Sequence, residues 1–100
     1  MITHILLLKV ASGIDKAAVG QRLGDIAQLA IPGLVSVAVA RDLGLRDDNW
    51  HYALVCEFHS VEDYRRYDSD PDHGEIKKAI GPMVESIARV QLDLGERISQ

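Results

Sequence analysis

The sequence contains a single cysteine, Cys56, so the chain cannot form an internal disulfide bond. Cys56 lies in an apolar run, where a cysteine is usually a small buried hydrophobic residue and not a nucleophile. The chain has no run of Lys and Arg and carries a formal net charge of -4, so we expect no nucleic-acid partner. Its apolar run over residues 5–10 is far too short to span a bilayer, and its first residues lack the basic segment and cleavage site of a signal peptide. These absences favour a cytoplasmic protein with no membrane partner.

The motifs of common cofactor and metal sites are also missing. The chain has no phosphate-binding loop, no dinucleotide fingerprint, no nucleophile elbow and no cysteine pair. His51 and His59 share a face only if one strand carries both, and eight strand residues span about 26 Å, which is too far for one metal ion. We therefore expect no cofactor and no metal site.

The length and the apolar content describe one small globular unit. The chain has 100 residues, 47% of them hydrophobic, and no linker or repeat divides it. We expect residues 1–100 to form a single domain. A chain this short buries only about 60–65% of its unfolded surface, so a partner subunit would add to its stability.

Hydrophobic periodicity predicts the order strand, helix, strand, strand, helix, helix, strand. The expected ranges are a strand over 3–10, a helix from about 15 to 31, strands over 34–40 and 50–58, a short helix after 60–63, a helix from 70 that ends or kinks at 81–82, and a strand over 87–94. Residues 60–63, with the sequence SVED, match a capping box. Asp70 is a suitable N-cap and Pro71 suits the first helical position.

Side-chain alternation indicates where two of the strands lie in the sheet. The first strand places His4 and Leu6 on one face and apolar residues on the other, so it is expected to be central. The second strand places Val35, Val37 and Val39 on one side and only small residues on the other. That pattern fits an edge position with one closely approached face.

Four strands, with helices after the first and the third, predict a ferredoxin-like α+β plait with a four-stranded antiparallel sheet. The helices would cover one face of the sheet. The other face would expose a surplus of small and apolar side chains, which usually marks an interface. Two sheets packed face to face in a symmetric homodimer would bury that surplus and form a dimeric α+β barrel. The space between each sheet and its helices would be the pocket.

The segment from Tyr64 to His73 is the main candidate for chemistry, because it ends one helix, starts the next and brings Tyr67 and His73 close together. His73 falls in the first turn of the second of these helices. The partial positive charge of a helix N-terminus opposes imidazolium, while the neighbouring Asp70 and Asp72 favour it. A proton-transfer group and a solvated helix start that merely carries a histidine are both consistent with these residues.

Five further residues are candidates for a substrate pocket, namely Tyr52, His4, His51, Trp50 and Tyr64. A lone histidine on a central strand, such as His4, is also consistent with a core or interface residue whose hydrogen bonds are satisfied. The aromatic side chains could line a pocket with polar groups or simply fill the core. Both interpretations stay open from the sequence.

Four segments of the chain resemble one known family. These segments are residues 2–9 (ITHILLLK), 31–33 (IPG), 52–58 followed by 60–63 (SVED), and 67–73. The chain resembles the stress-responsive A/B barrel (Dabb) domain of the dimeric α+β barrel superfamily over nearly its whole length. The resemblance implies a homodimer and a role in the stress response. Relatives include the plant olivetolic acid cyclase, which closes a linear tetraketide by an aldol condensation without metal or cofactor.

The resemblance to that cyclase carries over residue by residue. Tyr67 and His73 have the spacing of the tyrosine and histidine that line the cyclase pocket. Tyr52 stands where the cyclase has a further histidine on the third strand, and His51 precedes it on the opposite face. Asp70 replaces the first histidine of the family's His-Pro-x-x-His run and keeps the N-cap.

Three classes of function follow from the sequence. The first is a cofactor-free cyclase, lyase or isomerase in which neutral His73 removes a proton next to a carbonyl and Tyr67 stabilises the developing enolate by hydrogen bonding. The second is a non-catalytic module that binds a small apolar or aromatic ligand. The third is a structural dimer associated with stress. The resemblance favours a stress-responsive A/B barrel protein with a small-molecule pocket over any named reaction.

Overall fold

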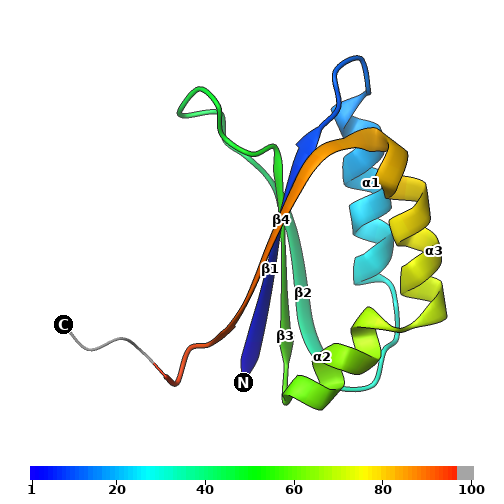
Figure 1. The fold of residues 1–100 in the computed structure, drawn as a ribbon, viewed down its shortest axis with the longest axis vertical. Coiled ribbons are helices and arrows are strands. Elements are labelled where there is room, and N and C mark those ends of the chain that lie inside the picture. The colour runs from blue at the N-terminus through cyan, green and yellow to red at the C-terminus, as the bar shows by residue number, and fades with distance from the viewer. Residues whose placement is uncertain (97–100) are drawn as a thin grey trace.

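The computed structural model describes residues 1–96, which form a four-stranded antiparallel sheet with helices on one face (Figure 1). The strands are β1 (Ile2–Val10), β2 (Leu34–Arg41), β3 (Tyr52–Phe58) and β4 (Val84–Asp93); the helices are α1 (Lys16–Ala27), α2 (Val61–Asp68), α3 (Pro71–Ile80) and the short 3-10 helix η1 (Gly81–Met83). The strand order is β2-β3-β1-β4, so the predicted ferredoxin-like plait, the central β1 and the edge position of β2 are confirmed. The expected domain boundary at residue 100 lies outside the described residues.

The register of β1 decides which side chains meet beneath the helices. His4 lies opposite Cys56 of β3 on one side and opposite Gln91 of β4 on the other. Because successive strand residues point to opposite faces, this register puts His4, Leu6 and Arg89 on the same face of the sheet. That face is the one that the helices cover.

Three strand details differ from the sequence-based expectation. A register shift between Leu34 and Ser36 displaces Val35, which is 45% exposed and does not share the face of the other two valines. β3 begins at Tyr52, two residues late, because the chain at His51 donates its backbone N–H to the carbonyl of Leu8 at 2.7 Å instead of pairing in regular register. β4 begins at residue 84, directly after the 3-10 helix.

Three side chains cap the helices and fix where each begins. Asp15 accepts a hydrogen bond from the backbone N–H of Ala17, and Ser60 accepts one from Asp63, as the capping-box pattern predicted. Asp70 caps α3 by accepting from the backbone N–H of His73 at 3.0 Å. The Asp70 cap, followed by Pro71 at the first helical position, fixes the first turn of α3 and therefore the backbone of His73.

The core lies between the sheet and the helices. Its most deeply buried side chains are Leu8, Val19, Leu23, Leu54, Cys56, Phe58 and Tyr67. Cys56 is fully buried, which confirms the expectation that it serves as a small core residue. Burial raises the pKa of its thiol to about 11, so the thiol stays protonated at neutral pH. Within residues 1–96, no helix is both long and apolar enough to cross a membrane.

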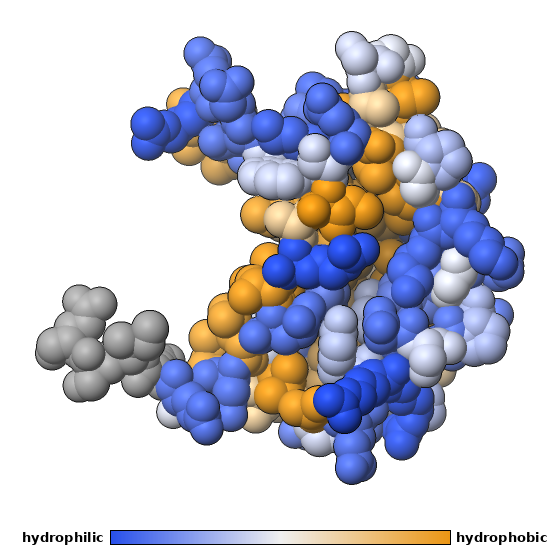
Figure 2. All heavy atoms as spheres, in the orientation of Figure 1, coloured by the Kyte–Doolittle hydropathy of each residue, from blue (hydrophilic) through white to orange (hydrophobic). Residues whose placement is uncertain are grey.

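The face of the sheet away from the helices is not covered by any helix or strand of residues 1–96. Figure 2 shows hydrophobic atoms along this side, below the loop between β2 and β3. Val90 of β4 lies there opposite Ile5 of β1 and is 44% exposed. Ala53 and Val55 of β3 continue the same apolar surface, which we call the open face. A continuous apolar sheet face of this kind is typical of an interface.

Candidate functional site

A cavity of about 400 Å³ lies between the sheet and the helices. Its apolar wall comes from leucine and isoleucine side chains of β1, α1, β3, α3 and β4. Its polar lining consists of His4, Tyr64, Tyr67, Asp68, His73, Lys77 and Arg89. An apolar pocket with a few convergent polar groups is the usual form of a small-molecule site.

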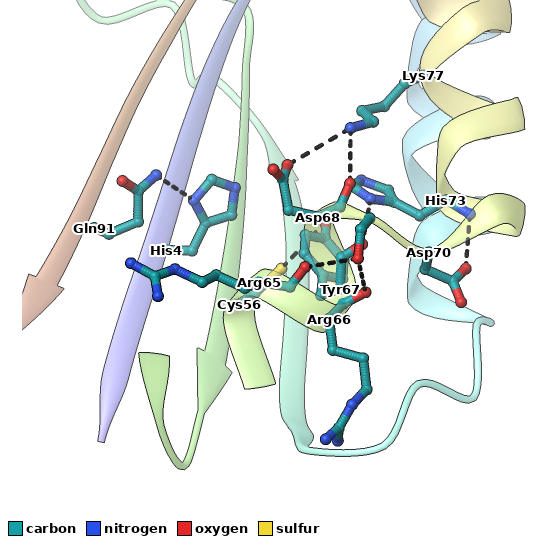
Figure 3. Close-up of polar contacts among 11 residues, drawn as sticks. His4, Cys56, Arg65, Arg66, Tyr67, Asp68, Asp70, His73, Lys77 and Gln91 are labelled. Atoms are coloured by element: carbon teal, nitrogen blue, oxygen red, sulfur yellow. Dashed lines mark hydrogen bonds and ion pairs between the residues drawn. The ribbon is translucent and has the colours of Figure 1, made fainter. Parts of the chain in front are cut away.

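His73 enters this cavity from the first turn of α3, and its residue is only 5% exposed (Figure 3). Its Nδ1 lies 2.9 Å from the backbone carbonyl oxygen of Tyr67. A carbonyl can only accept, so Nδ1 carries the proton of the neutral ring. The Nε2 atom therefore keeps a free lone pair that can accept a proton. Because His73 is buried, it is not the solvated side chain that one interpretation of the sequence allowed.

Tyr67 is buried beside His73 and contacts the His73 ring both with its side chain and with its backbone carbonyl. Its ring stacks on the His73 ring with centroids 4.0 Å apart and an interplanar angle of 27°, and its carbonyl fixes the tautomer of that ring. Its hydroxyl lies 3.9 Å from Sγ of Cys56, which acts as the donor in this weak contact. Burial raises the pKa of the Tyr67 phenol, so the hydroxyl keeps its own hydrogen for donation.

His4 approaches the same cavity from the middle of the sheet and is 4% exposed. The side-chain amide of Gln91 donates to its Nδ1 at 3.0 Å. Nδ1 is thus the acceptor, and Nε2 carries the proton of the neutral ring. Tyr64 packs 5.2 Å from the His4 ring, centroid to centroid. The two cavity histidines are therefore in opposite tautomers: Nε2 of His73 is an acceptor, and Nε2 of His4 is a donor.

Burial lowers the pKa of both cavity histidines below the ordinary value of 6.5. Desolvation is the largest cause for His73, and the ammonium of Lys77 acts in the same direction against the Tyr67 carbonyl, Asp68 and Asp70. For His4 desolvation is again the largest cause, followed by the guanidinium of Arg89. The balance that the sequence left open at His73 is thus decided by burial, which keeps both rings neutral at pH 7.

We expect the free energy of unfolding to fall as the pH drops below about 6.5, because the unfolded state then binds more protons at His4 and His73 than the folded state does. The contribution of the two histidines to stability is fully present above their pKa in the unfolded chain. It is lost as the pH falls toward their lower pKa values in the folded protein. Urea midpoints at about pH 7.5 and about pH 5.5 measure the loss. His73→Gln should weaken the pH dependence, and His59→Gln, at an exposed histidine, should not. A midpoint that is constant or rises on acidification contradicts this expectation.

Three charged side chains lie at the cavity, and none of them was among the predicted site residues. Asp68 and Lys77 form an ion pair at 3.6 Å, and the Lys77 ammonium also donates to the Asp68 carbonyl at 3.2 Å (Figure 3). Arg89 lines the cavity from β4. Its alternation with apolar neighbours on β4 was visible in the sequence, but only the sheet register reveals that its face is the one beneath the helices.

Three of the predicted pocket residues lie elsewhere. The Tyr52 hydroxyl donates a hydrogen bond to the carbonyl of Lys16 at 3.0 Å and so connects β3 to α1. The hydroxyl fits there because Gly20 of α1 has no Cβ atom to occupy that space. His51 accepts the backbone N–H of Val10 at its Nδ1. Trp50 packs under the Lys9 ammonium, 5.4 Å from the ring centroid.

The expectation that Tyr52 or His51 contributes to the cavity is therefore wrong, and Trp50 is also absent from its lining. Each of these side chains meets a partner at the end of β1 or at the start of α1. The predicted residues that do meet at one cavity are His4, Tyr64, Tyr67 and His73. Among residues 1–96 there is no group of three or more His, Cys, Asp or Glu side chains that could hold a metal ion.

Solved structures of known proteins share this fold. A dimeric ferredoxin-like protein of unknown function from Thermobifida fusca YX is 30% identical, with a TM-score of 0.83 over 93% of this chain and 90% of that chain. Hydroxynitrile lyase from Passiflora edulis is 24% identical, with a TM-score of 0.82 over 98% of this chain and 96% of that chain. A mutant of SnoaB, a cofactor-independent oxygenase from Streptomyces nogalater, is 15% identical, with a TM-score of 0.78 over 99% and 97%. The last two likenesses show the fold alone.

Sequence comparison identifies the family. A search of curated proteins found no match. Residues 2–94, however, match the family model of the Stress Responsive A/B Barrel Domain, which covers all four strands and the helices that enclose the cavity. The resemblance inferred from the sequence is thereby confirmed, and this chain belongs to the stress-responsive A/B barrel domain (Dabb) family.

Proposed function

We propose that this protein is a cofactor-independent enzyme that moves a proton next to the carbonyl group of a small, mainly apolar substrate, in a reaction of the cyclase, lyase or isomerase type. The observation that carries the proposal is the tautomer of His73. Its Nδ1 proton is held by the Tyr67 carbonyl, which leaves a neutral Nε2 at an apolar cavity of about 400 Å³. A neutral imidazole at such a place is suited to act as a general base.

In the proposed reaction, Nε2 of His73 takes a proton from the carbon next to the substrate carbonyl. Negative charge then develops on the carbonyl oxygen and needs hydrogen-bond donors that are already in position. The Tyr67 hydroxyl and the Nε2–H of His4 are the donors that we assign to it, and both side chains line the cavity. The proton held by His73 can then return to another atom of the product, which completes the transfer without a cofactor.

The relatives give this proposal a chemical precedent. A hydroxynitrile lyase and a cofactor-independent oxygenase share the fold, so the fold is compatible with chemistry performed by protein side chains. Neither substrate is assigned to this chain, because a shared fold does not define a reaction. A cavity that only binds a small apolar ligand is the alternative, and the experiment below distinguishes the two.

We also propose that the protein is a homodimer that buries the open face. The apolar surface formed by Val90, Ala53 and Val55 supports this arrangement, as does the dimeric relative from Thermobifida fusca. We propose a cytoplasmic location and a stress-associated role, in keeping with the family and with a buried free thiol at Cys56.

The proposed function is tested by proton exchange, which needs no knowledge of the complete reaction. Short β-keto acids and linear polyketide thioesters are incubated in D2O with the wild-type protein or with buffer, and NMR follows loss of the hydrogens next to the carbonyl. We expect the protein to accelerate exchange of at least one compound, because general base catalysis contributes about 10²–10⁴-fold. Exchange at the buffer rate for every compound, with binding still visible as line broadening, would support the ligand-binding alternative and exclude catalysis of these substrates.

A further inference from the structure

Arg89 is the one cationic side chain at the cavity that has no partner within residues 1–96. Among these residues it takes part in no ion pair and no hydrogen bond of its side chain, whereas Lys77 is paired with Asp68. Arg89 lines the cavity from the edge strand β4, and its residue is exposed. A guanidinium with its five donors free, at the mouth of an apolar cavity, is available to a ligand.

The charges around the cavity leave a positive surplus. The carboxylate of Asp68 and the ammonium of Lys77 offset each other at 3.6 Å. His4 and His73 are neutral at pH 7 because burial lowers the pKa of both. Arg89 is thus the uncompensated charge at a cavity of a protein whose formal net charge is -4, so the local sign is opposite to that of the whole chain.

We propose that the substrate of this site carries a carboxylate, and that Arg89 binds it. This inference rests on the proposed function, which requires a carbonyl group in the substrate. It adds that the same substrate also carries a carboxylate. A planar guanidinium matches a carboxylate with two parallel hydrogen bonds, and such charge-assisted pairs fix orientation as well as affinity. Arg89 is accordingly a specificity-determining residue.

The position of Arg89 also limits how far the carboxylate lies from the reacting carbonyl. In the register of β1 and β4, Arg89 lies opposite Leu6, which is two residues from His4 on the same face. Two strand residues span about 7 Å and adjacent strands lie about 5 Å apart, so the Cα atoms of Arg89 and His4 are separated by roughly 8 Å. A carboxylate at Arg89 and a carbonyl oxygen at His4 therefore belong to a compound in which few bonds separate the two groups, such as a short keto acid. Its remaining apolar part would contact Leu23 and Ile26 of α1 and Leu54 of β3, which also line the cavity.

The test compares two probes of the same carbon frame, 4-phenylbutanoate and 4-phenylbutanamide, whose binding is measured by calorimetry at about pH 7.5. We expect wild-type protein to bind the acid at least about tenfold more tightly than the amide. Arg89→Met should remove this preference and leave the affinity for the amide unchanged. Arg89→Lys should keep part of the preference, because it retains the charge without the planar fork.

Arg46→Met is the matched control, since it removes the same charge from an exposed loop outside the cavity. It should retain the preference for the acid. The inference is overturned if wild-type protein binds both probes equally or does not bind the acid, or if Arg89→Met still prefers it. A preference that depends on Arg89 in a protein without proton exchange would support acid recognition and reject the proposed catalysis. Proton exchange that depends on His73, with no role for Arg89 in acid binding, would support the proposed catalysis and reject acid recognition by Arg89.

Discussion

Replacing His73 with alanine should lower the rate of proton exchange or product formation by about 10²–10⁴-fold, the usual contribution of a general acid–base group. The physical reason is that alanine removes Nε2, the proposed base, whose position the hydrogen bond from Nδ1 to the Tyr67 carbonyl fixes. The measurement is the initial rate with the best substrate of the panel, at saturating concentration and about pH 7.5. A loss in kcat with little change in KM is expected, since the imidazole acts in the transition state.

Two variants make the loss at His73 interpretable. His59→Ala removes an exposed histidine outside the cavity and should keep the wild-type rate. Tyr67→Phe keeps the stacked ring and the carbonyl that orient His73 but removes the hydroxyl donor, so it should reduce kcat less than His73→Ala does. A fully active His73→Ala protein with a wild-type melting temperature would show that His73 is not the base.

The fold was predictable because its signals are local. Alternation in β1, the capping box at residues 60–63 and the Asp70-Pro71 start of α3 each follow from a few neighbouring residues, and each is present in the structure. The misplaced Val35 shows the limit of such signals. A bulge adds one residue to a strand, so the residues before the bulge point to the opposite face from the one that simple alternation predicts. The run of valines contains no signal for this bulge.

The sequence predicted His4 as a site residue along with Tyr67 and His73, but it indicated how side chains meet only where they are close in sequence. Tyr67 and His73 are six positions apart, and one helix cap determines how they meet. The pairing of His4 with Gln91 spans 87 positions and depends on the register of β1 and β4. Tyr52 was assigned to the pocket from its place on β3, but the missing Cβ of Gly20 on α1 lets its hydroxyl reach another partner. Contacts of that kind require the assembled helix and sheet.

Wild-type protein at micromolar concentration should have about twice the mass of the 11.0 kDa chain, and Val90→Asp should reduce it to the monomer mass. Val90 lies on the open face opposite Ile5 and is 44% exposed in the single chain. An aspartate there remains solvated in a monomer but loses its water in a face-to-face dimer. Two-fold symmetry buries two such carboxylates without partners, and each costs several kcal/mol. Light scattering or sedimentation measures the mass.

Because Val90 is already exposed in the monomer, its replacement separates loss of assembly from loss of folding. Val90→Asp should keep the circular dichroism of a folded chain at half the mass, whereas a core substitution would unfold it. Leu43→Asp introduces the same charge at a loop position that is 84% exposed and should leave the dimer intact. A wild-type protein that is monomeric at micromolar concentration, or a Val90→Asp protein that remains dimeric, would show that the open face is not the interface. In that case the apolar surface formed by Val90, Ala53 and Val55 would need another partner, because a contiguous apolar patch usually marks an interaction site.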